Sequence, residues 1–583
     1  MALIDKASLL MVPSTYEAGK LYNVLPSGNR APDSTDQNNG YDQTRADFDF
    51  DRGSNAAATR VNAAGLIEKY RENLFTESNK FSDSDWTPKA GTFAQGVTDP
   101  NSGTDAWSWK AVNTDPFLYQ AKNFTGVHCL SIYVKGVGST IGEDFQIRVG
   151  GNLKDVVLTG DWQRVQHFGV LSGNTNIGFE YGNPATLNDV VHIYAAQLET
   201  GLVATDYLNS GATTAKSGVL VDLPRINYDA NGKNGALLLE PQRANLIQYS
   251  EYLNGIYWNG KIGVSFGTNQ TASPEGLDNS SLLKEDSSNG SHFAYKDLSL
   301  TSGTTYAISI YAKKNGTNRN LRFSDGGLGW SSGFTASFDL TAGTATGGDI
   351  ESVGNGWYRC SVTGTTNATT SRLIVYSTLN TATSYQGDGT SGVFLYGFQI
   401  EAASYSSSYI PNHGTSGGVT RAADSCLSSS ITTSTDFSII FEAKDFCLIN
   451  GSVGGSYDHI QFVFSPTGGP YGSGGSYHIY ANQLYYFNGS TNTSFGVIFN
   501  SQTDSKFALV KRGNKGIIYA NGVKKTEITL PSGADAKVIN WDTIDLTQSL
   551  QDAQGDVFGS KYQQILKFNS ALSDADLATL TTI

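Results

Sequence analysis

The sequence predicts an all-β protein built from tandem jelly-roll or β-sandwich domains, and three observations support this. Gly occurs 65 times, Tyr 30 times and Phe 28 times, whereas Met occurs twice, a balance that favours short strands joined by glycine-rich turns. At 583 residues the chain exceeds what one hydrophobic core usually supports. The third observation is an internal repeat of segments with strand-like patterning. Together they predict several separate sandwich cores.

Four pairs of segments carry the repeat, in the same order in both copies. Residues 73–86, NLFTESNKFSDSDW, match residues 245–258, NLIQYSEYLNGIYW, with identical Asn-to-Trp spacing. The other pairs are LSIYVK from Leu130 with ISIYAK from Ile308, GDWQR from Gly160 with NGWYR from Asn355, and VHIYAAQLETG from Val191 with VFLYGFQIEAA from Val393. Apolar and polar residues alternate in these blocks, which is the period of a strand with one buried face. Two copies of one sandwich are predicted.

Residues that recur in both copies are expected to build the fold rather than to form a site in one copy. They are Trp86/Trp258, Trp162/Trp357, Gln197/Gln399, Glu199/Glu401 and Tyr207/Tyr409.

The last 160 or so residues have a different composition and their own strand series. KFALVKRGNKGIIYANGVKK, from Lys506, reads as strand, turn and strand, followed by Asn521-Gly522, the strongest short hairpin signal. Near the end, Ser573 with Asp576 three residues later predicts a capped short helix. This segment is expected to form a third sandwich.

These motifs resemble known families. The hairpin ending in ANGV and the ALSDADLATL helix resemble the laminin-G-like type of the concanavalin A-like lectin/glucanase superfamily. The two repeats resemble carbohydrate-binding-module-like jelly rolls of phage tail proteins, through GNGWYRCSVT, GDGTSGVFLYGFQIE, SYIP and VTRAAD in the second copy. The first copy is shorter and lacks the Pro of SYIP. These resemblances imply lectin-like sandwiches throughout.

Two further segments, from Ala46 and from Pro224, resemble the halves of a connector common in phage fibre proteins. In that family the halves follow one another closely, whereas here the first repeat lies between them. This predicts a domain insertion at an exposed loop. The halves are expected to meet in space, with a turn at residues 62–65 and a hairpin turning at Asn231-Gly232.

The expected division of the chain follows from these matches. It comprises a virion-attachment region (1–45), the first connector half (46–72), the inserted first jelly roll (73–212), the second connector half (213–244), the second jelly roll (245–424) and the concanavalin A-like lectin domain (425–583).

The resemblances imply a bacteriophage virion fibre or spike subunit that binds host-surface or environmental glycans. It would be made in the host cytoplasm, lie on the virion surface, contact other virion proteins through its N-terminal region and form a homotrimer. Two alternatives stay open: a polysaccharide depolymerase tail spike, and a secreted adhesin or glycanase accessory module. Asp5 and Lys6 interrupt the apolar core that a signal peptide needs, which counts against secretion.

Charge and composition argue against other classes of partner. The net charge of −13 has no compensating basic block, so no nucleic-acid partner is expected. No stretch approaches the roughly 18 apolar residues of a membrane span, so no membrane insertion is expected. Four cysteines without a C-x-x-C spacing predict buried free thiols.

No catalytic residue and no cofactor is predicted. The seven histidines lack H-E-x-x-H spacing, no G-x-S-x-G elbow sits between a strand and a helix, and the last domain shows no E-x-D-x-E strand. Asp47, Asp49 and Asp51 resemble the start of a calcium loop, but Arg52 stands where such a loop needs Gly, so an amphipathic strand is favoured. Structural calcium elsewhere in a sandwich is left open.

Glycan binding is expected to use aromatic residues that the repeats do not share. Trp107 and Trp109 lie two apart, so on a strand their rings share one face and could form a platform for a sugar. Trp330, in GGLGW, is the candidate of the second copy, and Tyr471 and Tyr477 flank the GSGGS stretch of the last domain. The alternative is that the paired tryptophans pack against the opposite sheet.

Overall fold

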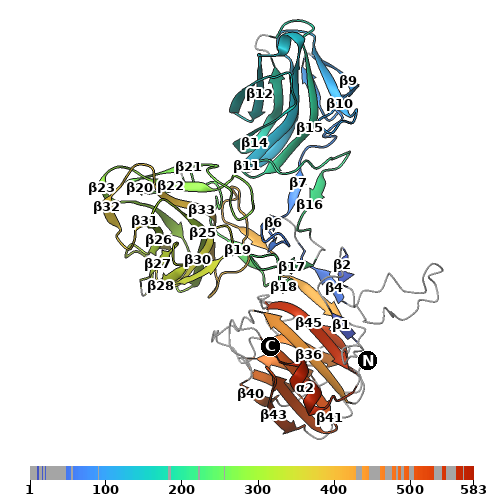
Figure 1. Cartoon of the computed structure of the whole chain (residues 1–583), viewed down its shortest axis with the longest axis vertical. Helices are drawn as coiled ribbons and strands as arrows, with labels where there is room; N and C mark the ends of the chain where they lie inside the picture. Colours follow the sequence, from blue (N-terminus) through green and yellow to red (C-terminus); the bar gives the residue numbers. More distant parts are fainter. Residues whose placement is uncertain are drawn as a thin grey trace, which may run out of the picture. The chain divides into compact units, whose positions relative to one another are not determined.

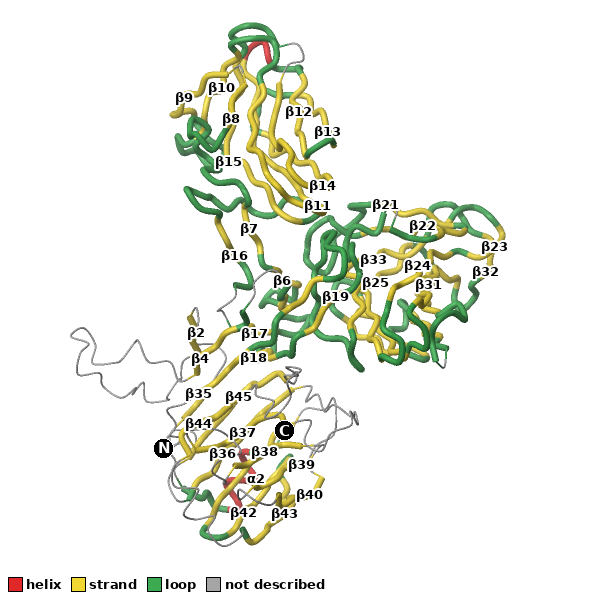
Figure 2. The backbone as a smooth tube through the Cα atoms, turned by 180° about the vertical axis from the view of Figure 1, so that it is seen from behind, coloured by secondary structure: helices red, strands yellow, loops and turns green. Residues whose placement is uncertain are grey.

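A computed structural model describes most of residues 57–428 and shorter stretches on either side. The described residues are 9–11, 16–17, 20–21, 48–53, 57–89, 91–181, 185–220, 224–254, 257–331, 333–428, 436–444, 460–466, 476–480, 483–487, 492–497, 505–530, 541–545, 560–568 and 570–582. Strands dominate the described chain, and helix is confined to short stretches (Figure 2). The all-β prediction is confirmed.

The chain divides into two compact units, each assembled from separate stretches of sequence. Unit 1 comprises residues 1–68, 219–243 and 420–583, and unit 2 comprises residues 69–218 and 244–419. Unit 2 therefore holds both repeat copies, and unit 1 holds the last segment together with most of the connector.

In the first copy, one continuous sheet folds over a core. Its order is β13-β12-β14-β11-β15-β10-β9, and β8 also pairs with β11. Its strands are β8 (Thr87–Lys89), β9 (Gly91–Val97), β10 (Ala106–Ala111), β11 (Phe117–Val137), β12 (Asp144–Val149), β13 (Asn152–Val157), β14 (Gln163–Tyr181) and β15 (Val190–Thr200), with a 3-10 turn η2 (Gly138–Thr140). The layers are joined because β11 and β14, of 21 and 19 residues, run through both.

In the second copy the corresponding strands are interrupted, so two separate sheets result. One has the order β21-β22-β33-β25-β30-β29 and the other β20-β24-β31-β26-β27-β28. The strands of the first are β21 (Val264–Gly267), β22 (Ser281–Glu285), β25 (Thr305–Asn315), β29 (Asp349–Ser352), β30 (Tyr358–Thr365) and β33 (Gly392–Glu401). Those of the second are β20 (Gly260–Ile262), β24 (Phe293–Ser299), β26 (Arg319–Ser324), β27 (Thr335–Asp339), β28 (Thr344–Thr346) and β31 (Thr370–Leu379). A small pair, β23 (Asn289–Ser291) and β32 (Ser384–Gln386), lies beside them.

The two copies share one strand order, as the repeat predicted. The run β9-β10-β15-β11-β14 corresponds to β21-β22-β33-β25-β30, and β8-β11-β14-β12-β13 corresponds to β20-β24-β31-β26-β27. Even the β-bulge is repeated, with register shifts between Ser131 and Tyr133 and between Ser309 and Tyr311. The second copy also has strands β28 and β29 and the pair β23–β32, for which the described residues of the first copy show no counterpart.

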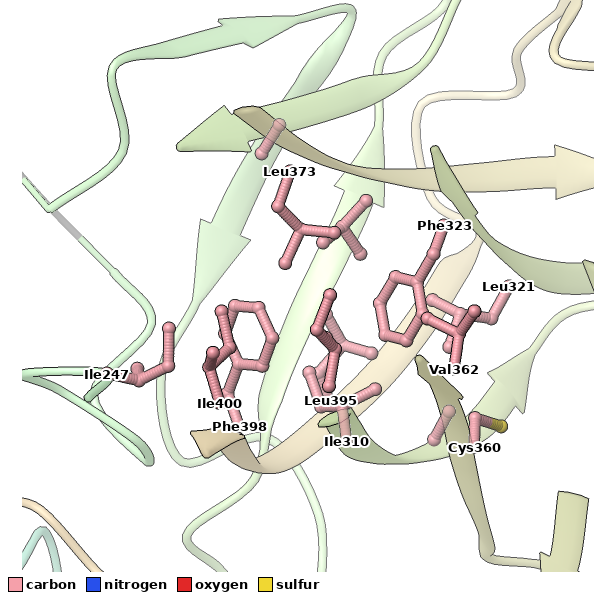
Figure 3. Packing of buried hydrophobic residues seen from close by; sticks show 14 of the residues in the cluster. Ile247, Ile310, Leu321, Phe323, Cys360, Val362, Leu373, Leu395, Phe398 and Ile400 are labelled. Atoms are coloured by element: carbon pink, nitrogen blue, oxygen red, sulfur yellow. The ribbon is translucent and has the colours of Figure 1, made fainter. Parts of the chain in front are cut away.

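Each copy closes over its own hydrophobic core. The core of the first copy includes Trp86, Leu130 and Phe179, each at most 2% exposed. That of the second includes Phe323, Leu395 and Phe398, which are fully buried (Figure 3). Apolar residues alternate along many of these strands, so one face contributes to a core and the other faces away from it, whereas β33 is buried along nearly its whole length.

The first copy is attached through a short two-stranded stem. β7 (Arg71–Asn73) leads into it and β16 (Ala215–Ser217) leads out, and the two strands pair antiparallel over three residues (Figure 1). Entry and exit of the copy therefore lie side by side, which is what an insertion requires.

Unit 1 contains two sheets that take strands from distant stretches. One has the order β17-β18-β45-β36-β41-β42-β43, with β1 also on β45, and the other β2-β3-β4-β35-β44-β37-β38-β39-β40. The strands of the first are β1 (Leu9–Met11), β17 (Arg225–Asn227), β18 (Ala236–Leu239), β36 (Phe437–Lys444), β41 (Ser505–Arg512), β42 (Lys515–Ala520), β43 (Val523–Thr529) and β45 (Ser560–Phe568). Those of the second are β2 (Tyr16–Glu17), β3 (Lys20–Leu21), β4 (Phe48–Asp51), β35 (Ser425–Ser428), β37 (Ile460–Pro466), β38 (Ser476–Tyr480), β39 (Gln483–Phe487), β40 (Asn492–Val497) and β44 (Trp541–Asp545).

Local predictions in unit 1 are confirmed. Asn521 and Gly522 have φ of 50° and 78° and form the two-residue turn between β42 and β43, as a type I′ hairpin requires. Helix α2 (Asp574–Leu580) begins after Ser573, whose hydroxyl accepts a hydrogen bond from the Asp576 amide. The segment with alternating Asp and Phe forms strand β4, as favoured over a calcium loop.

The connector halves meet, as predicted. β5 (Thr59–Val61) and β6 (Ile67–Lys69) pair around the turn at residues 62–65, where the Gly65 amide donates to the Asn62 carbonyl at 2.9 Å. The Tyr228 amide donates to the Val61 carbonyl at 2.9 Å, which joins the first half to the hairpin of β17 and β18. A further short pair, β19 (Arg243–Asn245) with β34 (Val419–Arg421), follows this hairpin in sequence.

A buried charge network holds the connector within unit 1. The side chains of Arg52, Arg225, Arg421 and Asp424 are fully buried, and Glu240 is nearly so. The Arg225 guanidinium lies 2.7 Å from Glu240 and also binds Asp424, and Arg421 lies 3.0 Å from Glu240. Three stretches that are far apart in sequence are thereby tied together by ion pairs rather than by a large apolar core.

Two further sequence predictions can be compared with the described residues. Cys129 and Cys360 are buried free thiols, as expected, Cys426 is buried, and Cys447 lies outside the described residues. None of the helices in the described part of the chain has the length and apolar character to cross a membrane.

Candidate functional site

Residues shared by the two copies form one hydrogen-bond network twice. Asn73 Nδ2 donates to the carbonyls of Ala196 (3.1 Å) and Leu208 (2.8 Å). Asn245 Nδ2 donates in the same way to Phe398 (3.0 Å) and Ile410 (2.8 Å). The side-chain oxygen of each asparagine accepts two backbone amides in return. These asparagines therefore fasten the first segment of each copy to its β15 or β33 strand.

A second shared network surrounds the Gln and Glu of those strands. Gln197 Nε2 donates to Glu199 at 2.7 Å, and Gln399 Nε2 donates to Glu401 at 2.8 Å. The Glu199 carboxylate accepts hydrogen bonds from the amide and hydroxyl of Thr205, as Glu401 does from Ser407. The prediction that the shared residues build the fold is confirmed for Gln197, Gln399, Glu199 and Glu401, whereas Trp162 and Tyr207 of the shared set are partly exposed in the first copy.

The tryptophans predicted to bind sugar lie in the cores. Trp107 and Trp109, on β10, are 6% and 0% exposed, and Trp330 is 6% exposed. The rings of Trp107 and Trp109 do share a strand face, but that face packs against Phe81 and Tyr181 inside the first copy. An exposed platform at these three residues is thus the wrong interpretation, because the strand turns this face toward the opposite layer.

The two tyrosines of the last segment are placed differently. Tyr477 lies in strand β38, in register with Tyr486 of β39, rather than in a loop. Tyr471 lies outside the described residues.

A row of partly exposed rings lies instead on the outer surface of the first copy. We call it the tyrosine face, and it consists of Tyr133, Trp162, His192, Tyr194 and Tyr207. Tyr133 and Tyr194 are paired across β11 and β15, with ring centroids 6.0 Å apart. Tyr194 lies 6.1 Å from Tyr207, and Trp162 lies 6.4 Å from His192. Alternation explains the exposure, because Val191 and Ile193 on β15 point into the core.

Polar and charged groups border these rings. The Arg164 guanidinium lies 5.6 Å from the Tyr133 ring centroid and donates hydrogen bonds to Ser131 and to the Thr205 carbonyl. Lys135 is opposite His192 in the strand register. Burial and the charge of Lys135 lower the pKa of His192, so this ring is neutral at pH 7. The face thus combines flat apolar rings with hydrogen-bonding tips.

Four of the five equivalent positions in the second copy are buried, whereas Phe394, the equivalent of His192, is partly exposed. Tyr311, Trp357, Tyr396 and Tyr409 are at most 6% exposed. The tyrosine hydroxyls are satisfied internally, since Tyr396 donates to Glu275 at 3.0 Å and Tyr409 to Glu251 at 3.0 Å. Exposure, not residue type, therefore distinguishes the two copies at these four positions.

Lys69 from β6 helps to cover this surface. Its Nζ lies 2.9 Å from both Glu251 and Glu275. Burial opposes its charge, but the two carboxylates outweigh that cost and raise the pKa of Lys69. In the first copy the position of Glu251 is occupied by Asn79, which bonds backbone groups of Ala195 and Asp105. A neutral residue therefore stands there, and the rings stay accessible.

The acidic and histidine side chains of the two copies can be examined for a metal centre. Within the described residues, no three His, Cys, Asp or Glu side chains gather as metal ligands. The buried Glu199 and Glu401 carboxylates are consumed by the shared network.

Comparison with known proteins finds partial matches among solved structures, all at low identity and low TM-score. No family model and no curated protein matches the chain. The sialidase CBM40 of Ruminococcus gnavus bound to α2,3-sialyllactose matches at 15% identity and a TM-score of 0.20, covering 26% of this chain and 84% of that one. The tandem CBM22 domains of Paenibacillus barcinonensis Xyn10C match at 12% identity and 0.21, covering 60% and 100%. The tandem CBM51 modules of Sp3GH98 from Streptococcus pneumoniae match at 11% and 0.17, covering 55% and 98%.

Proposed function

We propose that this chain is a non-catalytic glycan-binding subunit of a bacteriophage virion fibre or spike, and that the tyrosine face is its sugar site. The observation that carries the binding part is the difference between the copies. Four of the five ring positions are buried in the second copy and partly exposed in the first. Rings that a fold does not need to bury are available for a ligand.

The geometry of the face suits a sugar. Flat aromatic rings stack on the apolar C–H face of a pyranose, and phenol and imidazole edges can bond its hydroxyls, whereas Trp162 Nε1 already donates to the Thr98 carbonyl. The ring centroids of Tyr133 and Tyr194 are 6.0 Å apart, and those of Tyr194 and Tyr207 are 6.1 Å apart. Such a row can contact consecutive sugar units of one chain, and we propose an oligosaccharide rather than a monosaccharide as ligand.

Replacement of Tyr194 or Trp162 by Ala is expected to weaken glycan binding roughly tenfold or more, the effect of about 1.4 kcal/mol of lost ring contact. A glycan array probed with the purified chain identifies the sugar, and titration of the best hit measures the change. Tyr119→Ala is the matched control, because Tyr119 is a partly exposed ring of the same copy that does not belong to the tyrosine face. Its ring stacks on that of Phe117, with the two centroids 4.8 Å apart. Equal binding by all three folded variants would show that the tyrosine face is not the site.

The virion part of the proposal rests on the resemblance of the connector and of residues 1–45 to phage structural proteins. We expect the chain in purified particles, at the virion surface, and as a homotrimer of 62.4 kDa subunits. Mass spectrometry of gradient-purified virions and light scattering of the isolated protein test these points. Absence from the particles contradicts the virion role, and a monomeric mass contradicts the trimer.

A further inference from the structure

One side chain from each strand of the second sheet of the second copy lies in a single line across its outer surface. Neighbouring strands place these residues directly opposite one another. In order across β20, β24, β31, β26, β27 and β28, the line consists of Ile262, Phe293, Tyr376, Arg322, Ser337 and Thr346. We call this line the cross-strand row; several of its strands are labelled in Figure 1.

The row faces outward. Along the same strands the neighbouring residues Ala294, Phe323 and Val375 are fully buried in the core, so alternation turns the row to the other side. Ile262 is 48% exposed, and the rings of Phe293 and Tyr376 are partly exposed with their centroids 4.9 Å apart. One end of the row is therefore an apolar and aromatic surface, and the other carries hydroxyl groups.

Arg322, between these ends, has a charge without a counter-charge. Among the residues that the structure describes, no hydrogen bond, ion pair or ring contact engages its guanidinium, and its Nε is buried without a hydrogen-bond partner. Arg372, on the same sheet, differs completely: it bonds both oxygens of Asp297, at 2.7 and 2.9 Å, and stacks on Tyr295. The N–H donors of the Arg322 guanidinium are therefore available to an external hydrogen-bond acceptor.

The first copy carries the opposite charge in the corresponding row. There the register runs from Phe117 through Glu180 and Gln146 to Asp155. The arginine of that surface, Arg148, is already paired with Glu180 at 3.3 Å. The free cation is thus specific to the second copy and is not required by the shared fold.

We propose that the cross-strand row binds a glycan chain that bears a carboxylate, such as a uronic acid unit. The planar carboxylate matches the two-pronged donor set of Arg322. The adjoining sugar ring packs on Tyr376 and Phe293, and the next unit meets the hydroxyls of Ser337 and Thr346. Strands lie about 4.8 Å apart, so successive side chains of the row can meet successive parts of an extended oligosaccharide. This site lies on a different copy and a different sheet from the tyrosine face. The proposal therefore does not depend on sugar binding at the tyrosine face.

Calorimetric titration with oligogalacturonate and with its methyl ester tests this proposal on the full chain. The wild type is expected to bind the acid at least tenfold more tightly than the ester. Arg322→Gln is expected to remove that preference, and Tyr376→Ala to weaken both. Arg148→Gln is the matched control, because it deletes an arginine of the equivalent surface of the first copy.

The outcomes separate the two proposed sites. Retention of acid binding by Tyr194→Ala, together with its loss in Arg322→Gln, supports the row whether or not the tyrosine face binds sugar. No binding of the acid by the wild type, equal affinity for acid and ester, or unchanged binding in folded Arg322→Gln overturns the proposal.

Discussion

Replacement of Arg225 by Ala is expected to lower the free energy of unfolding of unit 1 by about 3–5 kcal/mol, the usual cost of breaking a buried ion pair by removing one partner. Arg225 is fully buried and binds Glu240, Asp424 and the Thr59 carbonyl. Without it, two buried carboxylates lose a counter-charge and the first connector half loses a hydrogen bond. Chemical denaturation followed by hydrogen exchange of the β18 amides and mass spectrometry measures the change in unit 1.

Arg60→Ala is the matched control for this substitution. Arg60 lies in the same connector and pairs with Glu68 at 2.7 Å, but both side chains are partly exposed, at 19% and 23%. Its loss is expected to cost less than about 1 kcal/mol. If the two variants lose similar stability, the connector is not held by its buried charges.

Replacement of Asn245 by Ala is expected to destabilise the second copy by about 3 kcal/mol or more. The side chain is fully buried and makes four hydrogen bonds to backbone groups. Removing it leaves two carbonyls and two amides without this hydrogen-bond partner, and each unsatisfied buried group costs about 1–3 kcal/mol before relaxation. Hydrogen exchange of β33 amides, followed by mass spectrometry, reports the loss locally.

Asn73→Ala provides the comparison, because this residue makes the same four bonds in the first copy. The two losses are expected to be similar and to add in the double variant, since the sites share no partner. Asn113→Ala, at an exposed position, is expected to change stability by less than about 0.5 kcal/mol. A small effect of Asn245→Ala would mean that the repeated network does not hold the copies together.

The repeat made the fold of unit 2 predictable. From Asn73 and Asn245 onward, the matched residues have similar sequence spacing in the two copies. This constrains the strand order, because residues with the same spacing along the chain are expected at equivalent positions in both folds. Period-two patterning then predicted the strands, and Asn521-Gly522 predicted its turn. These signals are local or come from comparing the two copies, so they can be recognised from the sequence without knowledge of the tertiary structure.

The binding surface was less predictable for physical reasons. A spacing of two places Trp107 and Trp109 on one strand face, but it does not say whether that face meets a core or the solvent. The tyrosine face was missed because exposure of Tyr194 and burial of Tyr396 depend on what covers them. Lys69, which helps to cover Tyr396, lies 182 positions before its partner Glu251. One sequence signal for this difference did exist: the position of Glu251 in the second copy is occupied by the neutral Asn79 in the first.

The short stem formed by β7 and β16 has a mechanical consequence. Tension along the chain reaches the first copy through two adjacent antiparallel strands joined by only three residue pairs. A pull on their outer ends loads these hydrogen bonds one after another, in an unzipping direction, rather than all at once in shear. The three stem pairs are therefore expected to open at a lower force than the pairing of β11 with β14, which extends over eighteen positions from Phe117 to Val134.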